Sequence, residues 1–295
     1  MGEVKTLGAY RAQVGEGSWW DSRRAVHWSV DIFAPALIRT EWTGIQTIWP
    51  MPEMAAGVVT MPGGALVIAM ETGLFRFDPD KDQLPKRFAA PDDLPETHRF
   101  NDLTVDPAGR LIIGTMRKSA LGPAPTGKLY IFDGACWTVI GDGLFTPNGL
   151  ACAPDGRTLY WSDSAPDVNR IWRSDYDPAS AMLGSPSLFC DMKTLRGRPD
   201  GAAMDVEGGY WIAAVGGGCL HRFLADGRLD RTLELPADHP TKPAFCGLAL
   251  DRLLVTTLSI RESQPVAAHA AGSIVSLAAP VAGMHLPDFR GPVEP

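Results

Sequence analysis

Residues 146–163 read TPNGLACAPDGRTLYWSD, a glycine-containing turn followed directly by a run of β-forming residues. The glycine of APDGRT supplies the positive φ that a tight hairpin requires. Three similar turns occur elsewhere in the chain, namely MPGGAL, DPAGRL and DVEGGY. The four turns begin at Met61, Asp106, Ala153 and Asp205, at spacings of 45, 47 and 52 residues. This recurrence predicts a repeated structural unit.

Each unit contains two β-rich runs separated by a short gap, and such a pair of runs occurs six times. A repeat of roughly 40 to 50 residues built only from strands is typical of propeller blades, each a four-stranded sheet that cannot bury its faces alone. We therefore expect an all-β fold in which residues 1–295 form a single six-bladed β-propeller domain, with four-stranded antiparallel blades around a central channel. The six pairs are AVHWSVDI with ALIRTE, ALVIAMET with GLFRFDPD, RLIIGTMR with GKLYIFDG, TLYWSDSA with NRIWRSDY, GYWIAAVG with CLHRFLAD, and LLVTTLSI with GSIVSLAA.

A helical fold is disfavoured, because apolar residues alternate or occur in short β-branched and aromatic blocks instead of recurring at helical spacing. Residues 175–182 and 191–195 could each form one helical turn at most. The repeat is not of the Trp-Asp type, since no blade ends in that dipeptide and TLYWSDS has a serine between the two residues.

The composition indicates a protein that binds neither nucleic acid nor a membrane. The formal net charge is −7, which disfavours a polyanionic partner. The five cysteines form no C-x-x-C pair, and we expect them to be reduced and mostly buried. No signal peptide and no apolar run of transmembrane length is visible, so we expect a cytoplasmic protein, either monomeric or a weak homo-oligomer.

Polar residues that interrupt the strand pattern are the candidates for function. Glu16 lies between two glycines in GEGSWW, and Arg99 and Asn101 belong to HRFND. Asn148 and Asp200 precede glycine in TPNGL and RPDGAAM. Each of these motifs could also be an ordinary turn, because Asn, Asp and Gly favour turns. However, Asn101, Asn148 and Asp200 all lie five residues before their blade turn, so a propeller would direct all three toward its axis.

Glu16, Asn148 and Asp200 would supply three oxygen ligands with two negative charges. Such a set suits a hard divalent cation and leaves room for water and a substrate, so we expect a metal in the central channel. A zinc site of Cys pairs or His-x-x-x-His spacing is absent from the sequence. The sequence also lacks a phosphate-binding loop, a Gly-x-Ser-x-Gly motif and support for Ser/His/Asp catalysis.

With these motifs in order, the chain resembles the family of regucalcin (senescence marker protein 30), gluconolactonases and luciferin-regenerating enzyme. The resemblance is carried by GEGSWW, RFNDLTVDPAGRLIIGTM, TPNGLACAPDGRTLYWSDS, RPDGAAMDVEGGYWIAAVGGG and LLVTTL. It implies a six-bladed propeller that hydrolyses a small lactone, such as a sugar lactone, to the open hydroxy acid. It further implies one divalent ion (Ca²⁺, Zn²⁺, Mn²⁺ or Mg²⁺) held by Glu16, Asn148 and Asp200. Arg99 and Asn101 would contact the substrate, and Asp200 would also be the catalytic base.

The chain departs from this family at three places. Ser18 follows Gly-Glu-Gly where proline is usual, the loop between Met116 and Gly127 lacks an acidic residue that contacts substrate in some members, and Leu248 in FCGLALD replaces a second glycine. Two other functions remain open at this stage. One is a propeller that binds calcium or another ligand without catalysis, and the other is a metal-dependent hydrolase of aryl esters or phosphotriesters.

Overall fold

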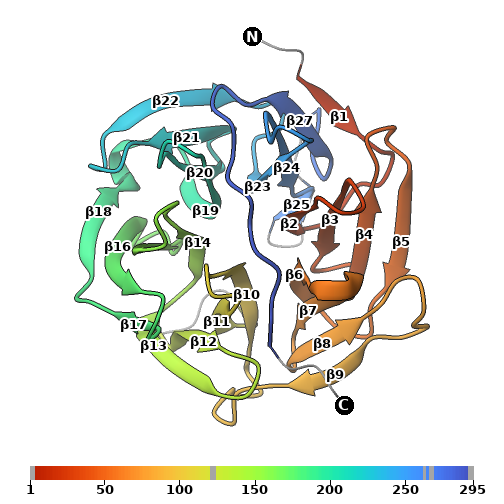
Figure 1. The fold of residues 1–295 in the computed structure, drawn as a ribbon. Helices are drawn as coiled ribbons and strands as arrows, with labels where there is room; N and C mark the ends of the chain where they lie inside the picture. Colours follow the sequence, from red (N-terminus) through yellow and green to blue (C-terminus); the bar gives the residue numbers. More distant parts are fainter. Residues whose placement is uncertain (1–3, 120–123, 262–263, 266–268, 292–295) are drawn as a thin grey trace.

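The strands of the chain form a ring of antiparallel sheets around a common axis in a computed structural model (Figure 1). The structure describes residues 4–119, 124–261, 264–265 and 269–291. Within these ranges the strands build six blades of four or five strands each, plus one separate two-stranded sheet. The predicted six-bladed β-propeller is confirmed.

Each blade runs from an innermost strand to an outermost one. Blade 1 contains β2 (Gly15–Asp21), β3 (Val26–Asp31), β4 (Ala36–Thr40) and β5 (Gln46–Pro50), and blade 2 contains β6 (Ala55–Thr60), β7 (Leu66–Met70), β8 (Leu74–Phe77) and β9 (Lys86–Ala89). Blade 3 contains β10 (His98–Val105), β11 (Leu111–Arg117), β12 (Gly127–Phe132) and β13 (Trp137–Leu144). Blade 4 contains β14 (Pro147–Cys152), β15 (Thr158–Asp163), β16 (Arg170–Asp177), β17 (Met182–Leu183) and β18 (Ser187–Asp191). Blade 5 contains β19 (Arg198–Met204), β20 (Tyr210–Val215), β21 (Cys219–Phe223) and β22 (Leu229–Glu234), and blade 6 contains β23 (Pro240–Cys246), β24 (Arg252–Thr257), β27 (Ile274–Ala278) and β1 (Lys5–Leu7).

The remaining elements are short. They are β25 (Ile260–Arg261), β26 (Gln264–Pro265) and the 3₁₀ turns η1 (Pro62–Gly64) and η2 (Met192–Thr194). The turn η2 falls inside the segment 191–195 where one helical turn was predicted. In the described ranges no helix is long and apolar enough to cross a membrane.

The ring is closed by the N-terminus of the chain. Strand β1 pairs antiparallel with β27 and is the outermost strand of blade 6, so residues from both ends of the chain complete one sheet. The innermost strands contact one another in the cyclic order β2, β6, β10, β14, β19, β23 and back to β2. This order brings β2, β10, β14 and β19, which carry the candidate residues, around one axis.

The six predicted pairs of runs are the second and third strands of the blades, and the innermost strands precede the turns. Each innermost strand pairs with its neighbour through a register shift, for instance between Glu16 and Trp19 and between Asn148 and Ala151. The motifs that also fitted ordinary turns therefore lie in strands and not in loops. A β-bulge leaves a residue unpaired and changes the direction of its side chain, which is why bulges accompany functional sites.

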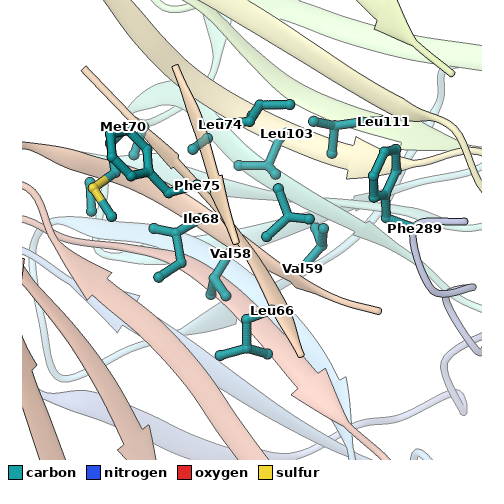
Figure 2. Packing of buried hydrophobic residues seen from close by; sticks show 14 of the residues in the cluster. Val58, Val59, Leu66, Ile68, Met70, Leu74, Phe75, Leu103, Leu111 and Phe289 are labelled. Atoms are coloured by element: carbon teal, nitrogen blue, oxygen red, sulfur yellow. The ribbon is translucent and has the colours of Figure 1, made fainter. Parts of the chain in front are cut away.

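Apolar side chains fill the space between neighbouring blades. Figure 2 shows the cluster between blades 2 and 3, where Val58, Leu66 and Ile68 pack with Leu103 and Leu111. Each of these side chains is at most 1% exposed. Full burial of one such side chain contributes about 1.5 to 3 kcal/mol. This packing makes the innermost strands a rigid support for polar groups at the axis.

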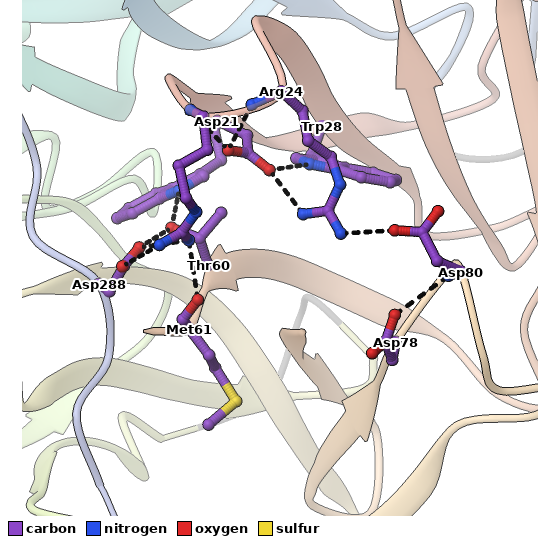
Figure 3. A network of polar contacts seen from close by, with 10 residues as sticks. Asp21, Arg24, Trp28, Thr60, Met61, Asp78, Asp80 and Asp288 are labelled. Carbon is purple, nitrogen blue, oxygen red and sulfur yellow. Dashed lines mark hydrogen bonds and ion pairs between the residues drawn. The ribbon is translucent and has the colours of Figure 1, made fainter. Parts of the chain in front are cut away.

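The C-terminal segment crosses one face of the ring, as the dark blue ribbon of Figure 1 shows. The amide of Phe289 donates to the carbonyl of Thr60 and the amide of Arg290 to that of Gly109, while Gly283 bridges to Asp205. The Asp288 carboxylate also accepts the Thr60 hydroxyl at 2.6 Å (Figure 3). The segment therefore ties blade 5 to blades 2 and 3 at the end of the ring where the hairpin turns lie.

Candidate functional site

One equivalent position can be identified in the innermost strands of blades 1 to 5. Its residues each lie five places before the residue that opens the hairpin turn of their blade, namely Asp21, Met61, Asp106, Ala153 and Asp205. These residues are Glu16, Ala56, Asn101, Asn148 and Asp200. In blade 6 the bulge lies one residue further from the turn, and Thr241 of Pro-Thr-Lys lines the same cavity as Asn148 of Pro-Asn-Gly and Asp200 of Pro-Asp-Gly. The offset of five residues in the sequence thus reflects a real structural equivalence. It brings Glu16, Asn101, Asn148 and Asp200 to one level of the ring.

These residues line a cavity of about 580 Å³. Its walls include Glu16 from β2, Arg99 and Asn101 from β10, Asn148 from β14 and Asp200 from β19. The volume falls within the roughly 300 to 1,000 Å³ typical of small-molecule sites. All five residues predicted from the sequence are therefore brought together, although their individual roles remain predictions.

The amide of Asn148 is held in one orientation. Its Nδ2 donates to the Ser164 hydroxyl at 2.7 Å, and that hydroxyl donates to the carbonyl of Pro199. The Asn148 Oδ1 accepts a hydrogen bond from Asn101 Nδ2 at 2.9 Å. Because Ser164 occupies the nitrogen side, the oxygen side is available as a ligand.

Arg99 is a buried cation with an unused donor. It is only 8% exposed, and its Nη1 donates to the carbonyl of Phe100 at 2.8 Å and to Asn101 Oδ1 at 2.9 Å. Its buried Nε has no hydrogen-bond partner among the residues that the structure describes. Burial lowers the pKa of Arg99 to about 10, partly offset by the charges of Glu16, Glu71 and Asp200. Arg99 thus stays protonated at neutral pH and can donate to a ligand in the cavity.

Two carboxyl groups lie side by side in this cavity. The pKa of Asp200 is raised to about 7, first by burial and then by the charge of Asp102, while Arg198, Lys242 and a hydrogen bond with Glu16 oppose the shift. Burial, followed by the charges of Asp200 and Asp102, also raises the pKa of Glu16 well above its ordinary range. Two carboxylates enclosed this closely repel each other unless a cation or a proton lies between them.

The donor set fits a hard divalent cation. Glu16, Asn148 and Asp200 offer three oxygen ligands from blades 1, 4 and 5, with two negative charges. The fixed amide of Asn148 supports this fit, because Ser164 leaves only its oxygen for an ion. Over the described ranges no three His, Cys, Asp or Glu side chains form a metal-binding group, so the amide oxygen is essential to the set.

Sequence reasoning missed three residues of the site. Ser164 orients Asn148, Arg198 lines the cavity and donates to the carbonyl of Ser164 at 2.8 Å, and Thr241 lines the cavity from blade 6. Thr241 was detectable, because PTK in blade 6 corresponds to PNG and PDG in blades 4 and 5. Ser164 had no such signal, since its contact with Asn148 depends on the distance between two strands.

Comparison with known proteins shows the family of the chain. A family model described as "SMP-30/Gluconolactonase/LRE-like region" matches residues 14–259. The chain belongs to this family. Among the relatives, a pentonolactonase of Haloferax volcanii is 30% identical over 291 residues and an L-arabinolactonase of Azospirillum brasilense is 30% identical over 286 residues. The first alignment covers 96% of both chains, and the second covers 93% of this chain and 92% of the relative. The crystal structure of a calcium-binding protein, regucalcin from Agrobacterium tumefaciens, matches with a TM-score of 0.90 and 28% identity over 98% of both chains.

The three places where the sequence differs from the usual pattern of the SMP-30/gluconolactonase/LRE-like family differ in their solvent exposure and position. Ser18 is buried in β2, where its hydroxyl lies 2.6 Å from His27 Nε2, and Leu248 is 98% exposed. The loop between Met116 and Gly127 includes residues 120–123, which lie outside the described residues. Lys118 in this loop lines the cavity and forms an ion pair with Glu71. The loop that lacks the acidic residue of some family members therefore contributes a basic residue, Lys118, to the cavity wall.

Proposed function

We propose that this chain is a metal-dependent lactonase that opens a small sugar lactone to the hydroxy acid. Family membership supports a hydrolase of ester bonds, because the relatives named by activity include a pentonolactonase and an L-arabinolactonase. The observation that carries the proposal is the convergence of Glu16, Asn148 and Asp200 at a cavity that the guanidinium-bearing Arg99 also lines. Such a cavity combines oxygen ligands for a cation with a donor for a polar substrate.

Glu16, Asn148 and Asp200 would hold the ion. A bound divalent cation supplies positive charge that polarises the lactone carbonyl and favours deprotonation of water near neutral pH. The identity of the ion is part of the proposal, and Ca²⁺, Mg²⁺, Mn²⁺ and Zn²⁺ are the candidates.

Asp200 is the base in this scheme. Its carboxylate accepts a proton from the water that attacks the carbonyl carbon, the bond from that carbon to the ring oxygen breaks, and the proton passes to the ring oxygen as it leaves. Asp200 is 8% exposed, so bulk water has little access to the carboxylate. The Glu16 carboxylate accepts a hydrogen bond from the neighbouring Gly17 amide at 3.1 Å, and this contact restricts its orientation. Glu16 is therefore assigned as a metal ligand and not as the base.

Arg99 and Asn101 position the substrate. A guanidinium cannot ligate a cation, so Arg99 acts toward the substrate oxygens. Its contact with Asn101 Oδ1 makes the two side chains one hydrogen-bonded unit. Holding the lactone in a single orientation contributes to the rate without any bond being made to the protein.

The test is a panel of pentono- and hexonolactones, assayed by acid release with protein first treated with chelator. We expect no turnover after chelation and recovery with one or more of Ca²⁺, Mg²⁺, Mn²⁺ and Zn²⁺. Asp200→Ala should stay inactive at every metal concentration, whereas Asp226→Asn, which changes an exposed carboxylate, should behave as the wild type.

The outcomes separate the alternatives. Normal turnover by the chelated protein or by Asp200→Ala would refute the assignment of the site. Metal binding without turnover on any lactone would favour a non-catalytic metal-binding propeller; the regucalcin of Agrobacterium tumefaciens is described as a calcium-binding protein. Turnover of aryl esters or phosphotriesters but not of lactones would indicate a different hydrolase on the same scaffold.

A further inference from the structure

The position that follows each aligned site residue shows an unusual pattern. The residues of interest directly follow Glu16, Ala56, Asn101, Asn148, Asp200 and Thr241 in the six innermost strands. Four of these residues are glycine and the other two are oppositely charged. In blade order they are Gly17, Gly57, Asp102, Gly149, Gly201 and Lys242.

The glycines are required because there is no space for side chains at this level. A Cβ atom on Gly57 would lie 2.1 Å from Leu103 Cδ2, and one on Gly17 would lie 2.5 Å from the Cα of Gly57. On Gly201 it would lie 2.5 Å from Lys242 Cγ, so the absent side chain of Gly201 makes room for the lysine. The space at the axis is thus reserved for the two charged residues.

Lys242 and Asp102 form an ion pair across the ring. They come from blades 6 and 3, which lie three blades apart and hence on opposite sides of the axis. The Lys242 ammonium donates to Asp102 Oδ1 at 2.5 Å and to the carbonyl of Leu103 at 2.7 Å. Asp102 Oδ2 accepts the amide of Leu150 at 2.9 Å. Both charged residues are 5% exposed, so the pair is almost completely shielded from bulk water.

This pair lies next to the candidate metal ligands. Asp102 and Asp200 are buried and Glu16 is half-buried. The charges of Asp102 and Lys242 both act on Glu16 and on Asp200, with opposite signs. Without the lysine, three negative charges would face the site, one more than a divalent ion can balance.

We infer that Lys242 is a positioning residue that neutralises Asp102, withholds it from the metal, and so sets the site to two negative charges and one divalent ion. The inference rests on the proposed metal site. Asp102 already uses its two oxygens for Lys242 and for backbone amides, so it does not compete as a ligand. The Lys242 ammonium is thus a fixed positive charge next to the proposed divalent ion, which can exchange.

The test is calorimetric binding of Ca²⁺ to chelator-treated full-length variants at one pH and salt concentration. Lys242→Met leaves Asp102 unbalanced beside the site, so it should bind Ca²⁺ more tightly, or bind a second ion. Asp102→Asn leaves the ammonium unbalanced and should bind more weakly. The double variant removes both charges and should return to the wild-type affinity. A unit charge near a buried site shifts affinity by roughly tenfold, about 1.4 kcal/mol, in each direction.

A purely structural pair gives a different result, because both single changes would then weaken binding and the double change would not restore it. That outcome would overturn the inference. Lys193→Met removes an exposed lysine and controls for overall charge. If Lys242→Met does not fold, the comparison of Asp102→Asn with the double variant decides, since recovery of affinity supports the inference and its absence refutes it. If the wild type itself binds no cation and hydrolyses lactone after chelation, the proposed function fails as well.

Discussion

Replacing Arg99 by methionine separates substrate binding from metal binding. Methionine keeps much of the length of the side chain and removes the charge. The variant loses Nε, a donor without a partner in the described part of the chain, together with the bond from Nη1 to Asn101 Oδ1. A hydrogen bond that involves a charged group is worth about 1.5 to 3 kcal/mol. We therefore expect kcat/KM to fall roughly 10- to 150-fold.

Metal affinity should not fall in this variant. Arg99 is a cation that interacts with the charges of Glu16 and Asp200, so its presence opposes the binding of another cation. Its removal also relieves the burial of a guanidinium, which offsets the loss of two hydrogen bonds in the folded protein. The midpoint of thermal unfolding should stay close to the wild-type value.

The assay combines steady-state lactone hydrolysis at saturating metal with calorimetry of metal binding on the same preparation. Arg228→Met, which alters a guanidinium whose side chain is 74% exposed, is the control for loss of charge. A collapse of metal affinity at unchanged stability would place Arg99 in support of the metal and contradict the division of roles. Unchanged kcat/KM would show that Arg99 and Asn101 do not contact the substrate.

Three further changes test other parts of the structure. Ser164→Ala frees the Asn148 amide, so metal should bind about fivefold more weakly by calorimetry, the worth of one hydrogen bond of about 1 kcal/mol, and an unaltered affinity would contradict the orienting role of Ser164. Phe289 of the C-terminal segment is fully buried in the apolar cluster of blades 1 to 3, and Phe289→Ala should lower the free energy of unfolding in urea by about 3 to 5 kcal/mol with metal affinity intact. The pKa of Asp200 is raised from 3.8 to about 7 by burial and then by Asp102, and a carboxyl with a raised folded-state pKa contributes stability below its unfolded pKa that is lost as the pH rises through the folded pKa. Chelated protein should therefore lose thermal stability between about pH 4 and pH 7, and a slope unchanged in Asp200→Asn would argue against this origin.

The chain order of the blades could be predicted because it is written in local patterns. Turns such as DPAGRL need glycine at a fixed place, and the strands beside them alternate by hydrophobicity over a few residues. The site residues Asn101, Asn148 and Asp200 could be aligned for the same reason, since a constant offset from the turn is a constant position along a strand. Their location inside strands could not be predicted, because Pro-Asn-Gly and Pro-Asp-Gly favour turns when isolated and become bulges only when a neighbouring strand pairs with them.

What the sequence alone determined is the repeat, the fold class and the residue types available at the axis. The tertiary structure decided which of these side chains meet and in what orientation. Lys242 and Asp102 are 140 residues apart, and the Ser164 contact that orients Asn148 spans two strands of one blade, so neither has a local sequence signature. The closure of blade 6 by β1 likewise joins the two ends of the chain. Periodicity along a chain reports only which face a residue occupies, whereas contacts across a ring depend on how six separate sheets pack against one another.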